Sequence, residues 1–378
     1  MHTAKLPDIT TVENLKGRYV LLRASFNVPI VDGAVRDSFR IERALTTLQY
    51  LVSRGARVIL IAHIGRKKID SLRPVYDALQ KHMEIKWCGK TLGENVQKMR
   101  DSLTDSEILL LENVRQHEEE KENNDAFAQS LASLADIYIN DAFSDSHRKH
   151  ASIVGIPKHI PSYFGCSFIR EYTELSRARV PESPSLFILG GAKFETKLPL
   201  VEQYLTVYDN VFVGGALAHD IWRAKGFEIG KSLVSGVDLT EQSIITAPNL
   251  LLPIDVTVQL NGNTRIKTPE TVTKEETIVD AGPQTVAMLE QYITKAETIL
   301  WNGTLGKYED GFDTATKQLA RITAEAPGNV LMGGGDTVAS IGDLNLEDQF
   351  EFVSTAGGAM LYFLEHGSLP AIDAVVTR

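Results

Sequence analysis

Apolar runs of strand length alternate along the chain with longer stretches of helical periodicity. In the first half this pattern predicts strands at 19–23, 57–62, 108–111 and 137–140, and helices at 40–53 and 124–135. In the second half it predicts strands at 186–189, 210–213, 298–301, 329–332 and 351–354. Such alternation is typical of βα units that build a parallel sheet. We therefore predict an α/β fold of two Rossmann-like lobes, each a mainly parallel sheet flanked by helices.

The length of the chain also favours two domains, because 378 residues exceed what one hydrophobic core usually holds. A helix is predicted over 166–179, and Pro181 and Pro184 oppose its continuation. We expect a first lobe over 1–165, a hinge helix and linker over 166–182, a second lobe over 183–365 and a C-terminal segment over 366–378. The acidic run at 118–122 is interpreted as the solvated start of a helix.

The composition is that of an ordinary globular protein, with 43% hydrophobic and 23% charged residues. No segment approaches the roughly 20 apolar residues that span a bilayer, and the N-terminus lacks the apolar stretch of a secretory signal. Cys88 and Cys166 are too few for a disulfide framework. We expect a cytoplasmic protein without a membrane partner.

The charge balance makes the position of each cation informative. With 49 acidic and 39 basic side chains the net charge is -10, which disfavours nucleic acid as a partner. Ligands of parallel sheets collect beyond the carboxyl ends of the strands. In the first half those segments carry Arg23, His63, Arg66, Arg115, His147 and Arg148, and Arg40 opens the first long helix. Because guanidinium groups match phosphate and carboxylate, the set predicts a small polyanionic ligand, although each arginine alone could be an ordinary surface or ion-pair residue.

Glycine-rich turns follow the strands of the second half instead. They read GGAK at 190–193, GG at 214–215, GGGDT at 333–337 and STAGG at 354–358. Glycine lets the backbone approach a ligand closely, and a helix N-terminus offers unpaired N–H groups to phosphate. One such turn could need glycine for its geometry alone, but four in one lobe predict a nucleotide site. They match neither a Walker A loop nor a dinucleotide fingerprint.

Two further features bear on the reaction. Asp336 would repel phosphates unless a divalent cation lay between them, which indicates a magnesium-bound nucleotide. Lys193 and Lys197, four residues apart, share a helix face and either reach the same phosphates or lie exposed in solvent. We find no nucleophile with an adjacent base and no zinc motif. Phosphoryl transfer needs neither, because it depends on in-line positioning and on neutralising cations.

These motifs resemble the phosphoglycerate kinase family over essentially the whole chain. The first half contains RASFNVP at 23–29 with Asp32 and Gly33, Arg40 with Ile41, HIGR at 63–66, LLLENVR at 109–115, YINDAF at 138–143 and HRKHAS at 147–152. The second half contains LGGAK at 189–193 with Lys197, LPID at 252–255, WNG at 301–303, GGGDT at 333–337, and Ser354 and Thr355 with GG at 357–358.

The resemblance implies reversible phosphoryl transfer between 1,3-bisphosphoglycerate and ADP, giving 3-phosphoglycerate and ATP, with Mg2+, in glycolysis or gluconeogenesis. It implies catalytic roles for Arg40, Lys193, Gly357 and Gly358. The phosphoglycerate would be bound by Arg23, Ser25, Phe26, Asn27, Arg40, His63, Ile64, Gly65, Arg66, Arg115, His147 and Arg148. The nucleotide would be bound by Gly191, Ala192, Lys193, Lys197, Gly215, Asn302, Glu309, Gly334, Gly335, Asp336 and Thr337, with Asp336 also engaging the metal.

The resemblance further implies a monomer that transfers the phosphoryl group directly after its lobes close about the hinge helix. Direct transfer requires reacting atoms about 3 Å apart. Residues 369–378 would cross back onto the first lobe.

Four positions depart from the family pattern. Ser25 stands where an aspartate is expected beside the glycerate hydroxyl, so a charge-assisted hydrogen bond worth about 1.5–3 kcal/mol is missing. Ala216 and Ala356 replace glycines, and Thr304 replaces a proline. The alternatives to an active kinase are a divergent, weakly active or inactive relative, suggested by Ser25 and Ala216, and a non-catalytic anion-binding protein. Lys193, Lys197 and Asp336 count against the last.

Overall fold

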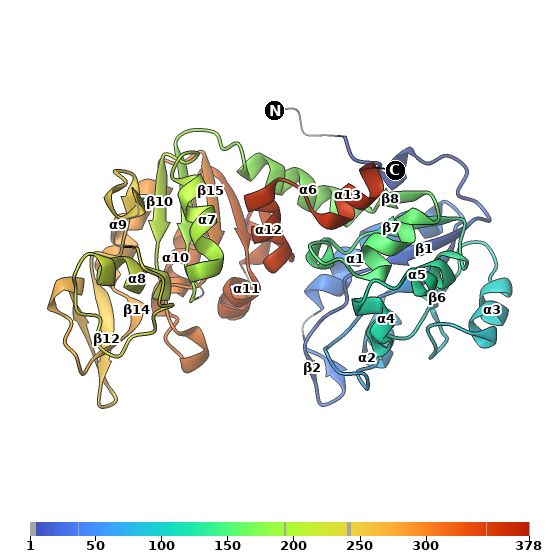
Figure 1. The fold of residues 1–378 in the computed structure, drawn as a ribbon, viewed down its shortest axis with the longest axis horizontal. Coiled ribbons are helices and arrows are strands. Elements are labelled where there is room, and N and C mark those ends of the chain that lie inside the picture. Colours follow the sequence, from blue (N-terminus) through green and yellow to red (C-terminus); the bar gives the residue numbers. More distant parts are fainter. Residues whose placement is uncertain (1–4, 37, 193, 240–242, 345, 378) are drawn as a thin grey trace. The chain divides into compact units, whose positions relative to one another are not determined.

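Two six-stranded sheets organise the chain (Figure 1). The computed structural model describes residues 5–36, 38–192, 194–239, 243–344 and 346–377. The chain divides into two units, one holding the residues up to Thr173 together with those from Ser368 onward, and the other holding Glu174–Gly367. All pairings within the two large sheets are parallel, which confirms the predicted fold class. No helix among the described residues has the length and apolar character needed to cross a membrane.

The sheet of the first unit has the strand order β5-β6-β4-β1-β7-β8. Its strands are β1 (Tyr19–Arg23), β4 (Arg57–Ile61), β5 (Lys86–Trp87), β6 (Ile108–Leu110), β7 (Ile137–Asn140) and β8 (Ser162–Phe164). The helices are α1 (Phe39–Ser53), α2 (Arg73–Leu79), α3 (Glu94–Asp101), α4 (Glu118–Lys121) and α5 (Asp125–Ala132), and a short hairpin joins β2 (Ile30–Val31) to β3 (Ala34–Val35). The four strands and two helices predicted for this half are present, with ends that differ by up to three residues.

Both faces of this sheet are covered, because β1, β4, β6 and β7 are apolar along most of their length and successive side chains point to opposite faces. Val20 and Leu22 pack with residues of α1 and α2. Leu21, between them in the sequence, packs with residues of α3 and α5 on the other face. The unit therefore has three layers, with helices on both faces of the sheet. We call the segments that follow the carboxyl ends of the strands the rim of the unit.

The second unit repeats this plan with the strand order β11-β10-β9-β15-β16-β17. Its strands are β9 (Ser185–Leu189), β10 (Asn210–Val213), β11 (Leu250–Leu251), β15 (Thr298–Asn302), β16 (Asn329–Gly333) and β17 (Phe352–Ser354). The helices are α7 (Phe194–Tyr204), α8 (Ala216–Ala224), α9 (Pro283–Ile293), α10 (Thr314–Ala324), α11 (Gly335–Ile341) and α12 (Gly358–His366). The five predicted strands of this half are confirmed.

The second unit also contains a three-stranded antiparallel sheet that the sequence pattern did not predict. It consists of β12 (Val256–Leu260), β13 (Asn263–Lys267) and β14 (Thr277–Ala281) in the order β13-β12-β14. Strand β13 is largely exposed and has no alternation of apolar and polar residues. The turn before it is formed by Asn261 and Gly262, both with positive φ, as a two-residue hairpin requires.

The C-terminal segment belongs to the first unit. Helix α6 (Cys166–Ala178) spans the division between the units, and α13 (Pro370–Val376) contacts the π-helical turn η4 (Ala151–Gly155) of the first unit. The backbone N–H of Ala371 donates to the carbonyl of Ser146 at 3.2 Å. The boundaries predicted for the hinge and linker stay a prediction.

The interpretation of the run 118–122 as a solvated helix start is wrong for one residue. Glu118 is exposed and pairs with Lys68, but Glu120 is fully buried. Its carboxylate accepts hydrogen bonds from the backbone N–H and the hydroxyl of Ser152 at 2.8 and 2.6 Å. Burial raises the pKa of Glu120, and Arg23 opposes this shift.

Candidate active site

The strand ends of the first unit bring four basic side chains to one point. Arg23 ends β1, His63 follows β4, Arg115 follows β6 and Arg148 follows β7. All four lie around the carboxylate of Asp145, the last residue of the short helix η3 (Phe143–Asp145). The shortest distances to its oxygens are 3.3 Å from His63, 3.6 Å from Arg115, and 3.7 Å each from Arg23 and Arg148. We call Arg23, His63, Arg115 and Arg148 the cationic cluster.

Arg23 is the buried support of this cluster. Its Nε donates to the Ser152 hydroxyl at 3.0 Å, and its Nη2 donates to His63 Nδ1 at 2.9 Å. Because arginine can only donate, Nδ1 of His63 is the acceptor and the ring proton lies on Nε2. Nε2 is buried and has no hydrogen-bond partner in the described part of the chain. A donor of this kind suits an anionic ligand.

Burial controls the protonation of the cluster. Burial first, and then the nearby arginines, hold the pKa of His63 well below its ordinary value, so the ring is neutral at pH 7. Burial also lowers the pKa of Arg115 to about 10. It would raise the pKa of Asp145, but the charges around that carboxyl, on His63 when protonated and on the three arginines, lower it to about 2. Three guanidinium charges and one carboxylate thus persist near neutral pH.

Hydrogen bonds join the other predicted residues of this rim. Asn27 accepts from Arg40 Nη1 at its carbonyl, at 2.7 Å, and from the N–H of Gly65 at its side chain, at 2.9 Å. Gly65 in turn accepts from Arg115 Nη1 at 3.2 Å. The side chain of His147 accepts from Arg148 Nε at 3.4 Å.

Three of the predicted contacts differ in kind from the rest. The side chains of Phe26 and Ile64 are buried in the hydrophobic core, so only their backbones can face a ligand. Arg66 is exposed at the rim, where its backbone N–H donates to Asp70 at 2.9 Å.

The prediction from sequence missed two carboxylates at this site. Asp145 lies within the segment 141–150 that follows β7, and Glu120 lies within an acidic run of the kind that is usually solvated. The available signal was that Asp145 shortly precedes the basic residues of a strand-end segment. Their burial beside arginines depends on contacts between distant parts of the chain.

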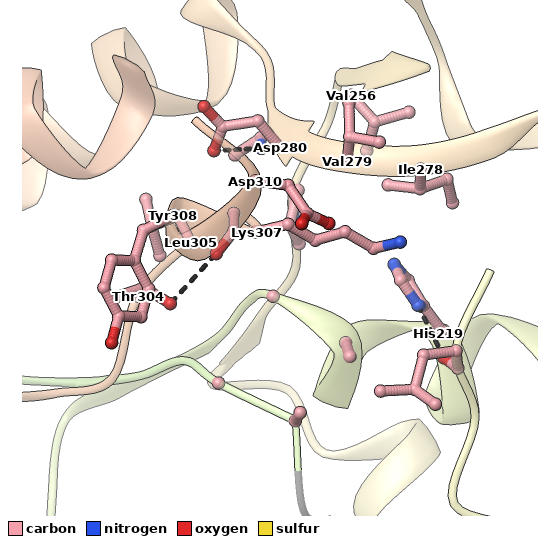
Figure 2. A pocket seen from close by; sticks show the side chains of 18 of the residues that line it. His219, Val256, Ile278, Val279, Asp280, Thr304, Leu305, Lys307, Tyr308 and Asp310 are labelled. Atoms are coloured by element: carbon pink, nitrogen blue, oxygen red, sulfur yellow. Dashed lines mark hydrogen bonds between the residues drawn. The ribbon is translucent and has the colours of Figure 1, made fainter. Parts of the chain in front are cut away.

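The second unit contains a cavity of about 450 Å3 beside the glycine-rich turns (Figure 2). This size suits a small-molecule ligand. The apolar part of the cavity wall is formed by Trp222, Leu233, Val256, Ile278 and Leu305. Of the residues predicted to bind nucleotide, Gly191, Ala192, Gly215, Glu309 and Asp336 line the cavity, together with the variant positions Ala216 and Thr304.

Two buried polar side chains face this cavity, and the prediction from sequence missed both. Nδ1 of His219 donates to the carbonyl of Leu233 at 2.8 Å, and burial lowers the pKa of His219 to about 4. The ring is therefore neutral, and its Nε2 is an acceptor. The side chain of Lys307 extends toward this ring (Figure 2). Asp280 accepts from the backbone N–H groups of Ala281 and Ala315 at 2.9 and 3.0 Å.

Some of the predicted nucleotide residues make protein contacts next to the cavity. Lys197 Nζ donates to the carbonyl of Gly190 at 2.7 Å. Asn302 donates to the carbonyl of Gly333 at 3.0 Å, and the hydroxyl of Thr337 accepts from the N–H of Gly303 at 2.8 Å. Both side chains thus stabilise the turns. Lys193 lies outside the described residues.

Two helix starts complete the site of the second unit. Helix α11 begins at Gly335, after Gly334 with φ +108°, and carries the exposed Asp336 in its first turn. Helix α12 begins at Gly358, after Gly357 with φ +51°, and its N-terminal N–H groups have no capping side chain. Such helix starts are favourable for anions.

Comparisons with known proteins cover the whole chain. The phosphoglycerate kinase family model matches residues 9–367. A phosphoglycerate kinase of Coprothermobacter proteolyticus is 40% identical over 99% of this chain and 100% of its own length, and one of Dictyoglomus turgidum is 39% identical over 95% and 96%. The solved structure of phosphoglycerate kinase from Coxiella burnetii has a TM-score of 0.86 at 34% identity, covering 99% of this chain and 100% of its own.

The two parallel-sheet units and the match to a solved kinase structure define the chain as a kinase of the two-lobed α/β class. The similarity to sequences and structures is nearly full-length in both directions. The chain belongs to the phosphoglycerate kinase family. It catalyses reversible phosphoryl transfer between 1,3-bisphosphoglycerate and ADP, giving 3-phosphoglycerate and ATP, in glycolysis. The predictions of family, reaction and enzyme class are confirmed.

Proposed function

We propose that the cationic cluster of the first unit binds the phosphoglycerate and that the cavity of the second unit binds the nucleotide. The observation that carries the first assignment is the convergence of basic residues from four strand ends around the buried carboxylate of Asp145, in a protein of net charge -10. In this assignment the anion is contacted by His63, Arg115 and Arg148. Arg23 positions His63 through the hydrogen bond to its Nδ1. Ser25, Asn27, Gly65, Arg66 and His147 complete the rim, while Phe26 and Ile64 contribute backbone groups.

Arg40 would stabilise the group in transfer. It extends from the first turn of α1 to the Asn27 carbonyl, so its guanidinium lies at the ligand side of the rim. A guanidinium offers a fork of donors to the equatorial phosphoryl oxygens. An acceptor carboxylate needs no general base, because it is already ionised at neutral pH. Transfer after closure about α6 stays a prediction.

The nucleotide base would enter the apolar cavity, with Glu309 near the ribose. Its phosphates would then meet Lys197, Gly191, Ala192 and the start of α11 at Gly334–Thr337, where unpaired N–H groups favour anions. The same argument applies to Gly357 and Gly358 at the start of α12. The catalytic role of Lys193 stays a prediction.

Magnesium would be bound together with the nucleotide. In the described ranges of the chain, no group of three or more His, Cys, Asp or Glu residues could hold a metal. Mg2+ is commonly bound by one or two carboxylates plus substrate phosphates and water. Asp336 fits this mode, because its exposed carboxylate borders the cavity and accepts a hydrogen bond from Tyr308 at 3.3 Å. The ion would supply charge neutralisation for the phosphates.

We further propose that the protein is a cytoplasmic monomer that acts on these small molecules alone. The glycolytic reaction supports the location, and so do Cys88 and Cys166, which form no disulfide. Fractionation of cells and the mass of the purified protein in solution test these two statements. The first would be contradicted by enrichment in a membrane fraction, and the second by a stable dimer.

Steady-state kinetics with Arg115→Ala and Arg148→Ala test the placement of the substrates. Each change removes a guanidinium from the cationic cluster, so we expect KM for 3-phosphoglycerate to rise at least about tenfold, the factor given by 1.4 kcal/mol. KM for MgATP should stay within about twofold, because that ligand binds the other unit. Lys98→Ala is the matched control, since Lys98 is an exposed cation of α3 that pairs with Glu94. Equal rises of both KM values would contradict the assignment.

A further inference from the structure

Asp145 is a carboxylate buried in the middle of an anion site. Its side chain is 5% exposed, and among the described residues it is the only acidic group within ion-pair distance of Arg115 and Arg148. Oδ1 faces these two arginines, whereas Oδ2 faces Arg23 and His63. A carboxylate at this place weakens the attraction of the cluster for an anion. Its presence in a site for a phosphorylated acid therefore requires a reason.

The basic groups around Asp145 lie farther from its carboxylate than ordinary hydrogen bonds allow. Its distances to the three guanidinium groups and to neutral His63 are 3.3–3.7 Å, which is longer than ordinary hydrogen bonds. Within the described ranges, Oδ2 of Asp145 and Nε and Nη2 of Arg115 have no hydrogen-bond partner. Buried polar groups are normally paired. These atoms are thus held in place by charge rather than by hydrogen bonds among the described residues.

Charge balance gives Asp145 a positioning effect. Three guanidinium groups drawn to one point repel one another, because Coulomb energy is large at a few ångströms in a poorly hydrated site. A single carboxylate attracts all three at once and so favours their convergence before a substrate arrives. The cluster then carries a net charge of +2, with His63 neutral.

The segment that carries Asp145 also touches Ser25. The hydroxyl groups of Ser25 and Ser144 lie 2.6 Å apart, and Ser144 immediately precedes Asp145 in η3. Position 25 is where the family resemblance leads us to expect an aspartate. In this chain the segment after β1 therefore offers a hydroxyl, and the neighbouring segment after β7 offers the carboxylate.

We propose that Asp145 is the positioning carboxylate of the acid-binding site and takes the place of the acidic side chain expected at position 25. The site works with a carboxylate at position 25 or at position 145, but not at both. The proposal rests on the placement of the phosphoglycerate on the first unit. It assigns Asp145 no contact with the reacting atoms.

A double-mutant cycle tests this exchange with the full chain. Asp145→Asn leaves a carboxylate at neither position 25 nor position 145, so we expect KM for 3-phosphoglycerate to rise about tenfold while KM for MgATP stays within about twofold. Ser25→Asp adds a second carboxylate, and repulsion of the anionic substrate should raise the same KM about tenfold. The combined variant has one carboxylate again and should return to within about threefold of the parent. A merely structural role of Asp145 would give no such rescue.

Several outcomes would overturn the proposal. Additive effects of the two substitutions, a lower KM in Asp145→Asn, or a lower KM in Ser25→Asp with Asp145 intact would each do so. If Asp145→Asn does not fold, as judged by circular dichroism, the Ser25→Asp variant alone still decides. Asp101→Asn, which changes an exposed carboxylate of α3, is the control and should leave both KM values unchanged.

The failure of this proposal can be told apart from failure of the underlying site. If Arg115→Ala leaves KM for 3-phosphoglycerate unchanged, the placement of the substrate is wrong. If Arg115→Ala raises that KM but the cycle is additive, the substrate site holds and only the role of Asp145 is wrong.

Discussion

At the scale of single residues, buried carboxyl groups divide into two kinds. Asp145 lies among arginines and stays ionised, whereas Asp280 forms no ion pair with another residue in the described part of the chain. Burial, with a contribution from Asp313, raises the pKa of Asp280 to about 7, although two backbone N–H groups donate to it. The charge of a buried acid is thus set by the groups facing it.

The raised pKa of Asp280 predicts a loss of stability with rising pH. Between about pH 4 and pH 7 the folded protein binds a proton that the unfolded chain releases, so the free energy of unfolding falls as pH rises through this range. Between pH 5 and pH 8 the loss amounts to at most about 3 kcal/mol. Asp280→Asn should remove this part of the pH dependence, as measured by urea unfolding at both pH values. Parallel pH curves for parent and variant would contradict the assignment.

At the scale of elements, the turns of the second unit pack backbone against backbone. The N–H of Gly190, after β9, donates to the carbonyl of Asn302 at 2.8 Å, and the N–H of Gly191 donates to that of Thr304 at 2.9 Å. A Cβ atom on Gly190 would overlap the carbonyl oxygen of Thr304. Glycine is thus required here for packing, in addition to any contact with phosphate.

Gly190→Ala should therefore destabilise the second unit. The added methyl group meets backbone, which cannot move aside as a flexible side chain can, so we expect a loss of about 1–3 kcal/mol in urea unfolding. KM for MgATP should rise as well, because Gly191 and Thr304 line the cavity. Gly342→Ala is the control, since a Cβ there meets nothing within 4 Å and φ is -58°. Equal effects of the two substitutions would contradict the packing argument.

At the scale of the whole molecule, the first unit is built from both ends of the chain. Leu369, Ala371, Ile372 and Val375 are buried, and Ala371 packs with Ile153 and Val154 of η4. The same segment bonds to Ser146, next to Asp145. The last residues therefore support the segment that carries the centre of the cationic cluster.

Removal of residues 368–378 should destabilise the first unit selectively. Each buried Leu, Ile or Val side chain contributes about 1.5–3 kcal/mol, so the loss should reach several kcal/mol. Hydrogen exchange should accelerate in η3 and η4, while affinity of the second unit for MgATP is unchanged. Val376→Ala, at a position that is 49% exposed, should change little. Faster exchange throughout both units would show that the segment has no selective role.

The order of elements could be predicted because its signals are local. The strand that ends at Arg23 is apolar from Val20 to Leu22, and the segments that follow the strands carry the glycine or basic residues. The exposed strand β13 and the short strand β5 carry no such pattern, so their existence depends on pairing with neighbours. The same limit applied to Glu120, whose burial follows from the approach of Ser152.

The sequence by itself determined the two α/β units, the family, and the contrast between cationic and glycine-rich strand ends, since periodicity and motif order are properties of neighbouring residues. Only the tertiary structure decided that Arg23 supports His63 rather than facing solvent, and that the buried carboxylate of Asp145 lies among residues from four strand ends. It also decided that Asp280 and His219 face the cavity of the second unit. These outcomes depend on burial and on charges far apart in the chain, which no local pattern contains.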